Sequence, residues 1–389
     1  MCARPLASSV SLRELDRMPS SAGVAAPIAT AHAGTPIRLT KTGELTMKQS
    51  SRVAFARARA AGAALIAVAF TLLSAAVLPR AACAADAVPA ELKLDYAYYS
   101  PESLVIRHHG WLEEAFAPDH TKITWVLSLG SNRALEYLNS GAIQIGSSAG
   151  LAAVLAKANG NPIRTVYIFS RPEWTALVVR KDSDIRSLAQ LKGRKIAATK
   201  GTDPYLFTLR ALHTAGLSAD DVEIVNLQHP DGRTALVNGQ VDAWAGLDPH
   251  MAAAEVDNGA RLLYRNVDFN TWGFLNARED FIQQYPDALA RVLKVYEKAR
   301  LWIAAHPDET ARIIASESKV SLAVAKLQLS RNDFSQPQPG PKQIAALKAA
   351  APILTQEQLV KPGTKVEQVV DALIDVRPAQ AVVASTRTP

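Results

Sequence analysis

The segment 146–150, with the sequence Gly-Ser-Ser-Ala-Gly, contains residue types that could perform two kinds of chemistry. Its G-x-S-x-G spacing is that of a hydrolase nucleophile elbow, in which Ser148 would be the nucleophile. Such a hydrolase also needs an acid and a later His, but the candidates Asp248, His250 and His306 come without a His-bearing loop after a strand. The same atoms could instead bind an anion, because a serine-rich turn that opens a helix offers N–H groups and hydroxyls. We favour anion binding. The alternative without a function is a self-capped helix with nothing bound.

A second segment, residues 200–204 (Lys-Gly-Thr-Asp-Pro), also opens a predicted helix and is interpreted as the counterpart of the first. Gly201 and Thr202 can offer N–H and hydroxyl donors to an anion. Asp203 complicates this interpretation, since its charge would repel an anion a few ångströms away by about 1 kcal/mol or more. Asp203 could therefore cap its own helix, or indicate a ligand with a cationic end.

Aromatic residues gather near the predicted ends of strands, where they could form apolar walls for an alkyl chain. They are Tyr98, Tyr99, Trp174, Trp244 and Trp272. Core packing is the default interpretation of each. Seven histidines follow residue 85, at positions 108, 109, 120, 213, 229, 250 and 306, without metal-site spacing to a carboxylate, and we interpret them as surface or capping residues. Gly-rich phosphate loops are also absent, so we expect no metal and no cofactor.

The pattern of helix, glycine and strand that leads to these residues occurs twice in the chain. Residues 133–145 and 233–243 each run a helical pattern into a glycine and then a short apolar strand. Gly141 and Gly239 lie where a helix ends in a left-handed residue, a conformation that costs little only without a Cβ. Each following strand would deliver a loop to the carboxyl edge of a sheet, where open α/β folds place ligands. Two such lobes would form a cleft, although two units of a single sheet would give the same pattern.

Other segments predict strands that alternate with helices, which indicates an α/β fold with two mainly parallel sheets flanked by helices. The predicted strands are residues 92–98, 122–127, 165–170, 174–179, 195–199, 222–226 and 271–276. Segments 174–179 and 271–276 are alike in length and polarity, so we expect two crossings between lobes, which form a two-strand hinge. The predicted divisions are 91–180 for the first part of lobe 1, 181–270 for lobe 2, 271–376 for the return to lobe 1 with the C-terminal helices, and 377–389 for a tail.

The N-terminal part of the chain reads as a secretion signal. Residues 47–85 combine a basic start, an apolar centre and a small-residue processing site, while residues 1–46 resemble a disordered extension or an upstream start. Residues 1–84 hold ten Lys and Arg against three Asp and Glu, so the formal charge of +7 lies there and the remainder is neutral. Both cysteines, Cys2 and Cys83, would be removed. The mature chain would therefore be periplasmic and lack disulfides, and no long basic run suggests a nucleic-acid partner.

Three stretches together resemble the aliphatic sulfonate-binding proteins of ABC importers, which belong with the taurine- and nitrate-binding proteins. They are residues 131–160, 192–216 and 238–251, with helix-Asn-x-Gly-x-Ile then Gly-Ser-Ser, Leu-Lys-Gly-x-Lys-Ile-Ala then Lys-Gly-Thr, and Asn-Gly-Gln-Val-Asp-Ala-Trp then Asp-Pro. The resemblance implies a type II periplasmic binding protein fold that closes about its hinge on a small anion, most simply an aliphatic sulfonate. It also implies a monomer that delivers the ligand to a membrane permease with its ATPase, without a catalytic step.

The resemblance also assigns residues of this chain to the ligand. The sulfonate oxygens would be held at Ser147, Ser148, Gly201 and Thr202, with Asp248 beside the cleft. Arg171 could supply a cation, and Tyr98, Ser100, Trp244 and Trp272 complete the candidate set. Taurine, nitrate or another small anion stays an alternative ligand. A serine hydrolase, or an enzyme of the same fold that makes the thiamine pyrimidine precursor, stays an alternative function, although the secretion signal and the missing thiols count against the latter.

Overall fold

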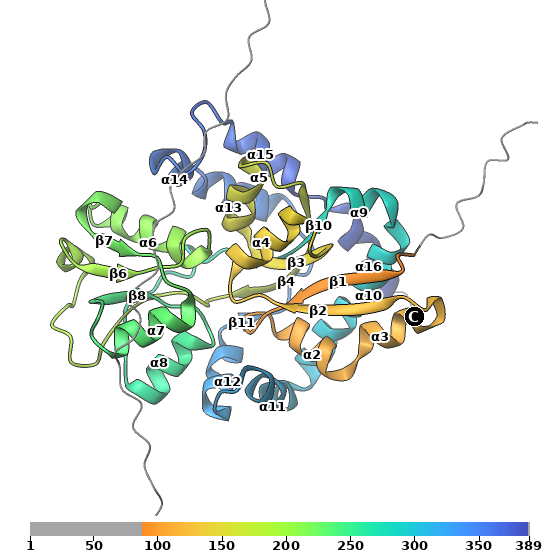
Figure 1. Ribbon diagram of the computed structural model, residues 1–389, viewed down its shortest axis with the longest axis horizontal. Coiled ribbons are helices and arrows are strands. Elements are labelled where there is room, and N and C mark those ends of the chain that lie inside the picture. Colours follow the sequence, from red (N-terminus) through yellow and green to blue (C-terminus); the bar gives the residue numbers. More distant parts are fainter. Residues whose placement is uncertain (1–87, 388–389) are drawn as a thin grey trace, which may run out of the picture. The chain divides into compact units, whose positions relative to one another are not determined.

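The computed structural model of the protein describes residues 88–387, so the predicted extension 1–46 and the whole predicted leader 47–85 lie outside the described residues. The described residues form a mixed α/β structure with two sheets flanked by helices, as the sequence predicts (Figure 1). None of the helices in this part of the chain is both long and apolar enough to cross a membrane.

The first sheet has the strand order β11-β4-β10-β3-β1-β2. Its strands are β1 (Glu91–Tyr96), β2 (Lys122–Leu127), β3 (Ile145–Ala149), β4 (Ile163–Pro172), β10 (Gly273–Arg278) and β11 (Asn332–Asp333). The helices that connect its early strands are α2 (Pro101–His109), α3 (Trp111–Phe116), α4 (Ser131–Ser140) and α5 (Gly150–Ala158), with a 3-10 turn at Ala117–Asp119.

The second sheet has the order β7-β6-β8-β5-β9 and takes its strands from one continuous stretch of chain. They are β5 (Leu177–Val179), β6 (Lys195–Ala197), β7 (Glu223–Val225), β8 (Ala243–Ala245) and β9 (Arg261–Tyr264). Its helices are α6 (Asp203–Thr214), α7 (His229–Val237) and α8 (His250–Asn258), and 3-10 turns lie at Leu188–Leu191 and Ala219–Asp221.

The predicted repeat is present as two sheets of the same topology. The run β3-β1-β2, connected by α2 and α4 and followed by α5, corresponds to β8-β6-β7 with α6, α7 and α8. Gly141 and Gly239 end α4 and α7 with φ of 74° and 71°, as their glycine type predicts. Two units of one sheet, the alternative that the sequence left open, are therefore excluded.

The direction of the strands corrects one detail of the predicted fold, because the sheets are mixed and not mainly parallel. Strands β1, β2 and β3 pair in parallel, as do β6, β7 and β8, but β10 and β5 run antiparallel to their neighbours. Strand β5 enters the second sheet directly from β4, and β10 returns to the first sheet from β9. A strand that arrives from the other sheet runs against the strands that the local βα units supply.

The two crossings are present, but they are not continuous strands. Residues 173–176 and 265–272 connect the sheets without strand pairing. The side-chain amide of Asn270 accepts a hydrogen bond from the N–H of Thr175 (2.9 Å) and donates one to its carbonyl (3.2 Å). A side chain thus takes the backbone groups that a neighbouring strand would otherwise bind. This explains why the strands predicted at 174 and 271 begin only at Leu177 and Gly273.

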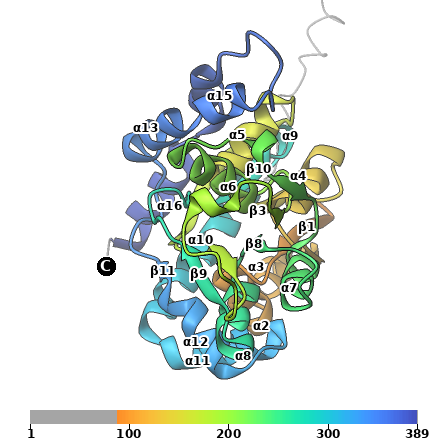
Figure 2. The ribbon, with the colours of Figure 1, turned by 90° about the vertical axis from the view of Figure 1, so that its left-hand side faces the viewer.

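The remaining helices form a C-terminal layer that touches helices of both sheets. They are α9 (Glu279–Gln284), α10 (Pro286–Ala305), α11 (Pro307–Ser318), α12 (Leu322–Ser330), α13 (Pro341–Ala350), α14 (Pro352–Gln356), α15 (Val366–Leu373) and α16 (Arg377–Arg387). Helix α10 packs on α16 and on α2, which connects strands of the first sheet. In contrast, α12 and α14 contact α8 and α6, which belong to the second sheet. Figure 2 shows α8 and α12 side by side.

One carboxyl group lies in the core without a partner. Glu102, the second residue of α2, is 0% exposed, and neither carboxyl oxygen has a hydrogen-bond partner among the described residues. Burial raises the pKa of Glu102 well above its ordinary range, because the charged form loses its hydration. The folded protein therefore keeps a proton on Glu102 that the unfolded chain releases.

We expect Glu102→Gln to stabilise the protein increasingly as pH rises from 5 to 7. Below the unfolded pKa of about 4.3 the wild-type carboxyl is neutral in both states, and above it the unfolded chain gains about 1.4 kcal/mol per pH unit until the raised folded pKa is reached. Urea unfolding at several pH values measures this difference. Glu367→Gln is the matched control, since Glu367 is exposed at the second position of α15. The same pH dependence in both variants would contradict the assignment.

Candidate functional site

Helix α6 begins with backbone donors that have no acceptor. Gly201 is left-handed (φ 78°) and Thr202 is the extended residue before the helix. The hydroxyl of Thr202 donates to the carbonyl of Thr199 (2.6 Å), which draws the turn tight. The N–H groups of Gly201, Thr202 and Asp203 bond to no described residue, although Thr202 and Asp203 are each only 1% exposed. Such a buried helix start is suited to an anion.

Helix α4 begins in the same way and meets the helices of the second sheet. The N–H groups of Gly130, Ser131 and Asn132 have no acceptor within residues 88–387. A Cβ placed on Gly130 would lie 2.9 Å from Nε2 of His229, and one on Gly201 would lie 3.4 Å from Cβ of Asn132. The starts of α4, α6 and α7 therefore converge. We call this group the helix-start cluster, and its members are Gly130, Asn132, Thr199, Gly201, Thr202 and His229.

His229 is an interior residue, which corrects the expectation that the histidines lie at the surface or cap helices. It is 0% exposed in the first turn of α7, and its Nδ1 lies 3.2 Å from the hydroxyl oxygen of Thr199. Burial, with a smaller effect from His250, lowers the pKa of His229 to about 3, so its ring is neutral. His250 is half-buried, and its partial burial lowers its pKa to about 4.

Ser147 and Ser148 lie within strand β3 and not in a turn that opens a helix. The carboxylate of Asp95 accepts hydrogen bonds from the N–H (2.8 Å) and the hydroxyl (2.7 Å) of Ser147. The hydroxyl of Ser148 donates to the carbonyl of Ala149 (3.2 Å) and accepts from the amide of Asn276 (2.8 Å). Both serine hydroxyls are therefore engaged inside the protein, and neither donates toward an open space.

The start of α5 is closed as well, which corrects the prediction that it offers free N–H groups. The hydroxyl of Ser131 accepts from the N–H of Ala149 (2.9 Å), the carbonyl of Trp272 from Gly150 (3.0 Å), and the hydroxyl of Thr271 from Leu151 (3.2 Å). The self-capped alternative thus describes this helix. The free donors lie instead at the starts of α4 and α6.

Asp95 is a buried carboxyl that the sequence analysis did not select. It lies in β1 at 0% exposure, and burial raises its pKa to about 7, although the hydrogen bonds from Ser147 and Ser128 oppose that rise. Its only sequence signal was a carboxylate near the end of a strand in which apolar and polar residues alternate. The hydroxyl of Tyr99 donates to the carbonyl of Ser147 (3.1 Å), so Asp95 and Tyr99 together fix the end of β3.

The arrangement of a serine hydrolase is not formed. Ser148 pairs with Phe274 of β10 inside a sheet, whereas a nucleophile elbow needs a sharp turn. No described histidine hydrogen-bonds to the Ser148 hydroxyl, and its partners are Ala149 and Asn276. Without a base to take its proton, this hydroxyl is not activated.

Asp203 does not have the capping role that the sequence suggested. It does not cap its own helix, and its two oxygens accept hydrogen bonds from Nε1 of Trp174 (3.2 Å) and from the N–H and hydroxyl of Thr271 (both 2.8 Å). Trp174 lies in the first crossing segment and Thr271 in the second. Burial raises the pKa of Asp203, while the bonds from Thr271 and Trp174 counteract that rise. Asp203 therefore fastens the start of α6 to both crossings.

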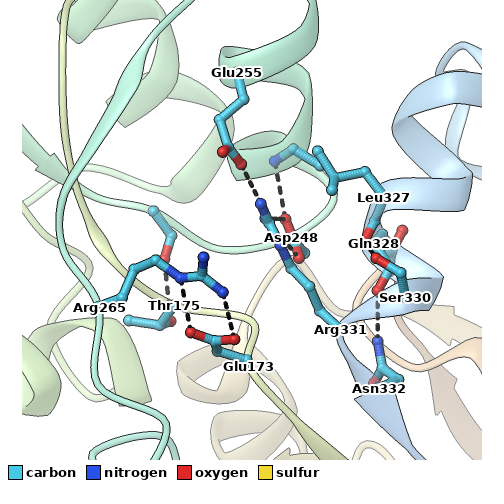
Figure 3. A network of polar contacts seen from close by, with 12 residues as sticks. Glu173, Thr175, Asp248, Glu255, Arg265, Leu327, Gln328, Ser330, Arg331 and Asn332 are labelled. Atoms are coloured by element: carbon cyan, nitrogen blue, oxygen red, sulfur yellow. Dashed lines mark hydrogen bonds and ion pairs between the residues drawn. The ribbon is translucent and has the colours of Figure 1, made fainter.

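Asp248 forms a second connection, between the loop before α8 and the segment after α12 (Figure 3). Its carboxylate lies 3.1 and 3.3 Å from Nη1 of Arg331, which also pairs with Glu255. The oxygen Oδ1 accepts from the N–H of Ala252 (2.9 Å). Burial raises the pKa of Asp248 to about 6, and Arg331 opposes this effect. The sequence analysis selected Asp248 but did not find Arg331, which lies 83 residues away.

The other candidates lie in different surroundings. Arg171 pairs with the exposed Asp268 (3.2 Å), and its guanidinium lies 5.7 Å from the ring centre of Trp272. Trp244 packs in the core beside the second sheet, against Gly232 of α7. Ser100 is buried before α2, and its hydroxyl has no partner among the described side chains and backbone. The carbonyl of Tyr98 accepts from the amide of Gln328 (2.6 Å).

Of the predicted residues, the structure therefore brings only Gly201 and Thr202 into the helix-start cluster. Gly130, Asn132 and His229 were missed. The Leu-Gly-Ser-Asn turn after β2 and the His-Pro pair at the start of α7 resemble the turns that were selected, so their positions after predicted strands could have indicated them.

Comparison with known proteins relates the chain to one group. The model of the family described as NMT1/THI5 like matches residues 122–310. A protein of Escherichia coli that carries the name aliphatic sulfonates-binding protein is 29% identical over 283 residues, which are 72% of this chain and 88% of that protein.

Two solved structures are similar at 27% identity. One is the alkanesulfonate-binding protein SsuA from Xanthomonas axonopodis bound to MOPS, with a TM-score of 0.68 over 74% of this chain and 99% of the other. The second is the periplasmic aliphatic sulphonate binding protein SsuA from Escherichia coli, with a TM-score of 0.63 over 72% and 92%. The predicted resemblance and the periplasmic binding protein fold are confirmed, and this homology supports a substrate-binding role in an ABC importer.

We expect Arg331→Met to lower the free energy of unfolding by about 3–5 kcal/mol at pH 8, because Asp248 would remain charged and buried without its cation. The loss should shrink as pH falls from 8 toward 6 and level off below, since without Arg331 the pKa of Asp248 lies above about 6 and the buried carboxyl takes up a proton there. Urea unfolding measures both effects. Arg265→Met, which breaks the exposed pair with Glu173, should cost less than about 1 kcal/mol. Equal losses in the two variants would contradict a buried connection at Asp248.

Asp203→Asn should lower the free energy of unfolding by about 1–3 kcal/mol, because an amide nitrogen cannot accept the bonds from Trp174 and Thr271. Denaturant unfolding followed by tryptophan fluorescence gives the loss. Asp268→Asn is the control, since Asp268 is a surface carboxylate on the second crossing. A loss no larger than that of the control would show that Asp203 does not hold the crossings.

Proposed function

We propose, from this kinship with the aliphatic sulfonate-binding proteins, that the chain is the substrate-binding component of an ABC importer and captures a small organic anion, most simply an aliphatic sulfonate. The observation that carries the proposal is the helix-start cluster, where backbone donors from both sheets are buried and lack acceptors. A sulfonate has three oxygens that accept hydrogen bonds, and each favourable contact at a helix start contributes about 0.3–1 kcal/mol, more where water is excluded.

Binding should couple to closure of two lobes about the crossings. The proposed lobes are residues 91–180 with 271–376, and residues 181–270. Donors at α4 belong to the first sheet and donors at α6 to the second, so an anion contacts both only when the sheets approach each other. A ligand that binds the closed state better shifts the population toward that state. The connections at Asp203 and Asp248 support closure, because they join the two sheets in the conformation described above.

The proposed site differs from the one that the sequence suggested. It keeps Gly201 and Thr202 and adds the start of α4, while Ser147 and Ser148 would support the sheet beside it. Ser100, with its buried hydroxyl, could be a further donor. Trp244 and Arg171 are left out of the site, since one is core and the other pairs at the surface.

The proposal includes no chemical step, and the engaged hydroxyl of Ser148 supports this view. We further propose that the leader is removed, that the mature chain acts as a monomer in the periplasm, and that it delivers its ligand to a permease and its ATPase. The periplasmic description of one SsuA supports the location. Taurine and nitrate are the competing ligands.

Isothermal titration with ethanesulfonate, taurine and nitrate tests the proposal. We expect at least one sulfonate to bind with a dissociation constant of about 1 μM, which corresponds to a binding free energy of about 8 kcal/mol. The protein should gain about 2.7 kcal/mol of stability at a hundredfold excess over that constant.

Gly201→Ala should weaken sulfonate binding about tenfold, since the new Cβ would occupy the space beside Asn132 where the anion is proposed to bind, and the left-handed turn would be strained. The control is Gly193→Ala, because Gly193 has a similar φ of +73° but no atom within 4 Å of the added Cβ. The proposal fails if none of the three anions binds. Equal affinity in the two variants would remove α6 from the site.

A further inference from the structure

The helix-start cluster contains a buried acceptor whose state is fixed by its neighbours. The hydroxyl of Thr199 lies 2.6 Å from the carbonyl of Leu227 and gives its proton to it. At 3.2 Å from His229, the same oxygen can therefore only accept, so Nδ1 of His229 carries the ring proton. Since the ring is neutral, Nε2 has a lone pair. It has no hydrogen-bond partner among the described residues, although His229 is 0% exposed.

A second acceptor without a donor lies beside the first. The side-chain oxygen of Asn132 is buried and unpaired, and it lies 2.9 Å from the point where a Cβ of Gly130 would stand. Nε2 of His229 lies at the same distance from that point. The glycine at position 130 therefore leaves both acceptors facing the start of α4. A buried acceptor without a donor costs about 1–3 kcal/mol, so a partner is expected.

The two kinds of group at this place make opposite demands on a ligand. The N–H groups of Gly130, Gly201 and Thr202 need acceptors, which a sulfonate supplies. The lone pair of His229 and the oxygen of Asn132 need a donor, and an anion oxygen beside them would be repelled. Both oxygens of Asp203 already accept hydrogen bonds from the crossings, so a donor group of the ligand is better served by the unpaired acceptors of His229 and Asn132. A plain anion such as nitrate therefore satisfies only half of the cluster.

We propose that His229, together with Asn132, determines specificity by accepting a hydrogen bond from a hydroxyl or ammonium group that the ligand carries close to its sulfonate. This inference rests on the proposed function and narrows its substrate class to sulfonates with a hydrogen-bond donor. The sulfonate lies at the starts of α4 and α6, and the donor group points toward α7. Failure to satisfy a buried polar group is an effective way to reject an analogue, which gives such a site its discrimination.

Titration of the protein with ethanesulfonate, 2-hydroxyethanesulfonate and taurine tests this inference. We expect the wild-type protein to bind at least one donor-bearing sulfonate at least ten times more tightly than ethanesulfonate. A preference for the hydroxyl or for the ammonium compound identifies which donor the site accepts. Equal affinity for all three would overturn the inference and leave the proposed function standing, whereas no binding of any sulfonate would reject the proposed function itself.

Two variants assign the preference to His229. His229→Phe should lose the tenfold preference for the donor-bearing sulfonate over ethanesulfonate, because an aromatic ring stays in place and the acceptor is gone. His229→Gln, whose amide oxygen can replace the acceptor, should retain part of it and tests the role even if the Phe variant folds poorly. His250→Phe is the control, since His250 is also the first residue of its helix but is only half-buried and lies outside the helix-start cluster. A preference that survives in both His229 variants would overturn the assignment.

Discussion

The position of the candidate site depends on the burial of one carboxylate, Asp203. A charged group is costly to bury unless donors replace its hydration, and Trp174 and Thr271 supply three hydrogen bonds. Because these donors belong to the two segments that cross between the sheets, Asp203 cannot be satisfied unless both crossings run beside the start of α6. The carboxylate thus holds the open N–H groups of Gly201 and Thr202 against the first sheet. The helix-start cluster follows from this constraint.

Helices that follow strands in the repeat use their N-terminal ends for different purposes. The N–H groups at α5 are closed by Ser131, Thr271 and Trp272, so this helix serves the connection between strand β3 and the second crossing. The starts of α4 and α6 lack such acceptors and lie where the sheets meet. In the second half, the carboxylate of Asp248 pairs with Arg331, so it also has a partner within the protein. Anion binding is therefore expected where internal partners are missing, and not wherever a strand leads into a helix.

Local patterns predicted much of the fold. Gly141 and Gly239 marked the corresponding helix end in each copy of the repeat, because a left-handed helix end is decided by the residue itself. Only the ends of the crossings, residues 174–176 and 271–272, were wrongly predicted as strand. At Thr175 the amide of Asn270, which is 95 residues away in the sequence, takes the place of a strand partner. The site was predicted only in part for the same reason. Nothing near Asp203 in the sequence shows that Thr271 will occupy its oxygens, and nothing near His229 shows that Gly130, at the start of α4, will lie beside its ring.

A crystal structure of the protein with 2-hydroxyethanesulfonate is the most direct test of whether a sulfonate binds at the helix-start cluster. We expect the sulfonate oxygens to lie within hydrogen-bond distance of the N–H groups of Gly201 and Thr202 and of those at the start of α4. A sulfonate bound beside Ser147 and Ser148 with the bonds to Asp95 broken, or one bound outside the region between the two sheets, would contradict it.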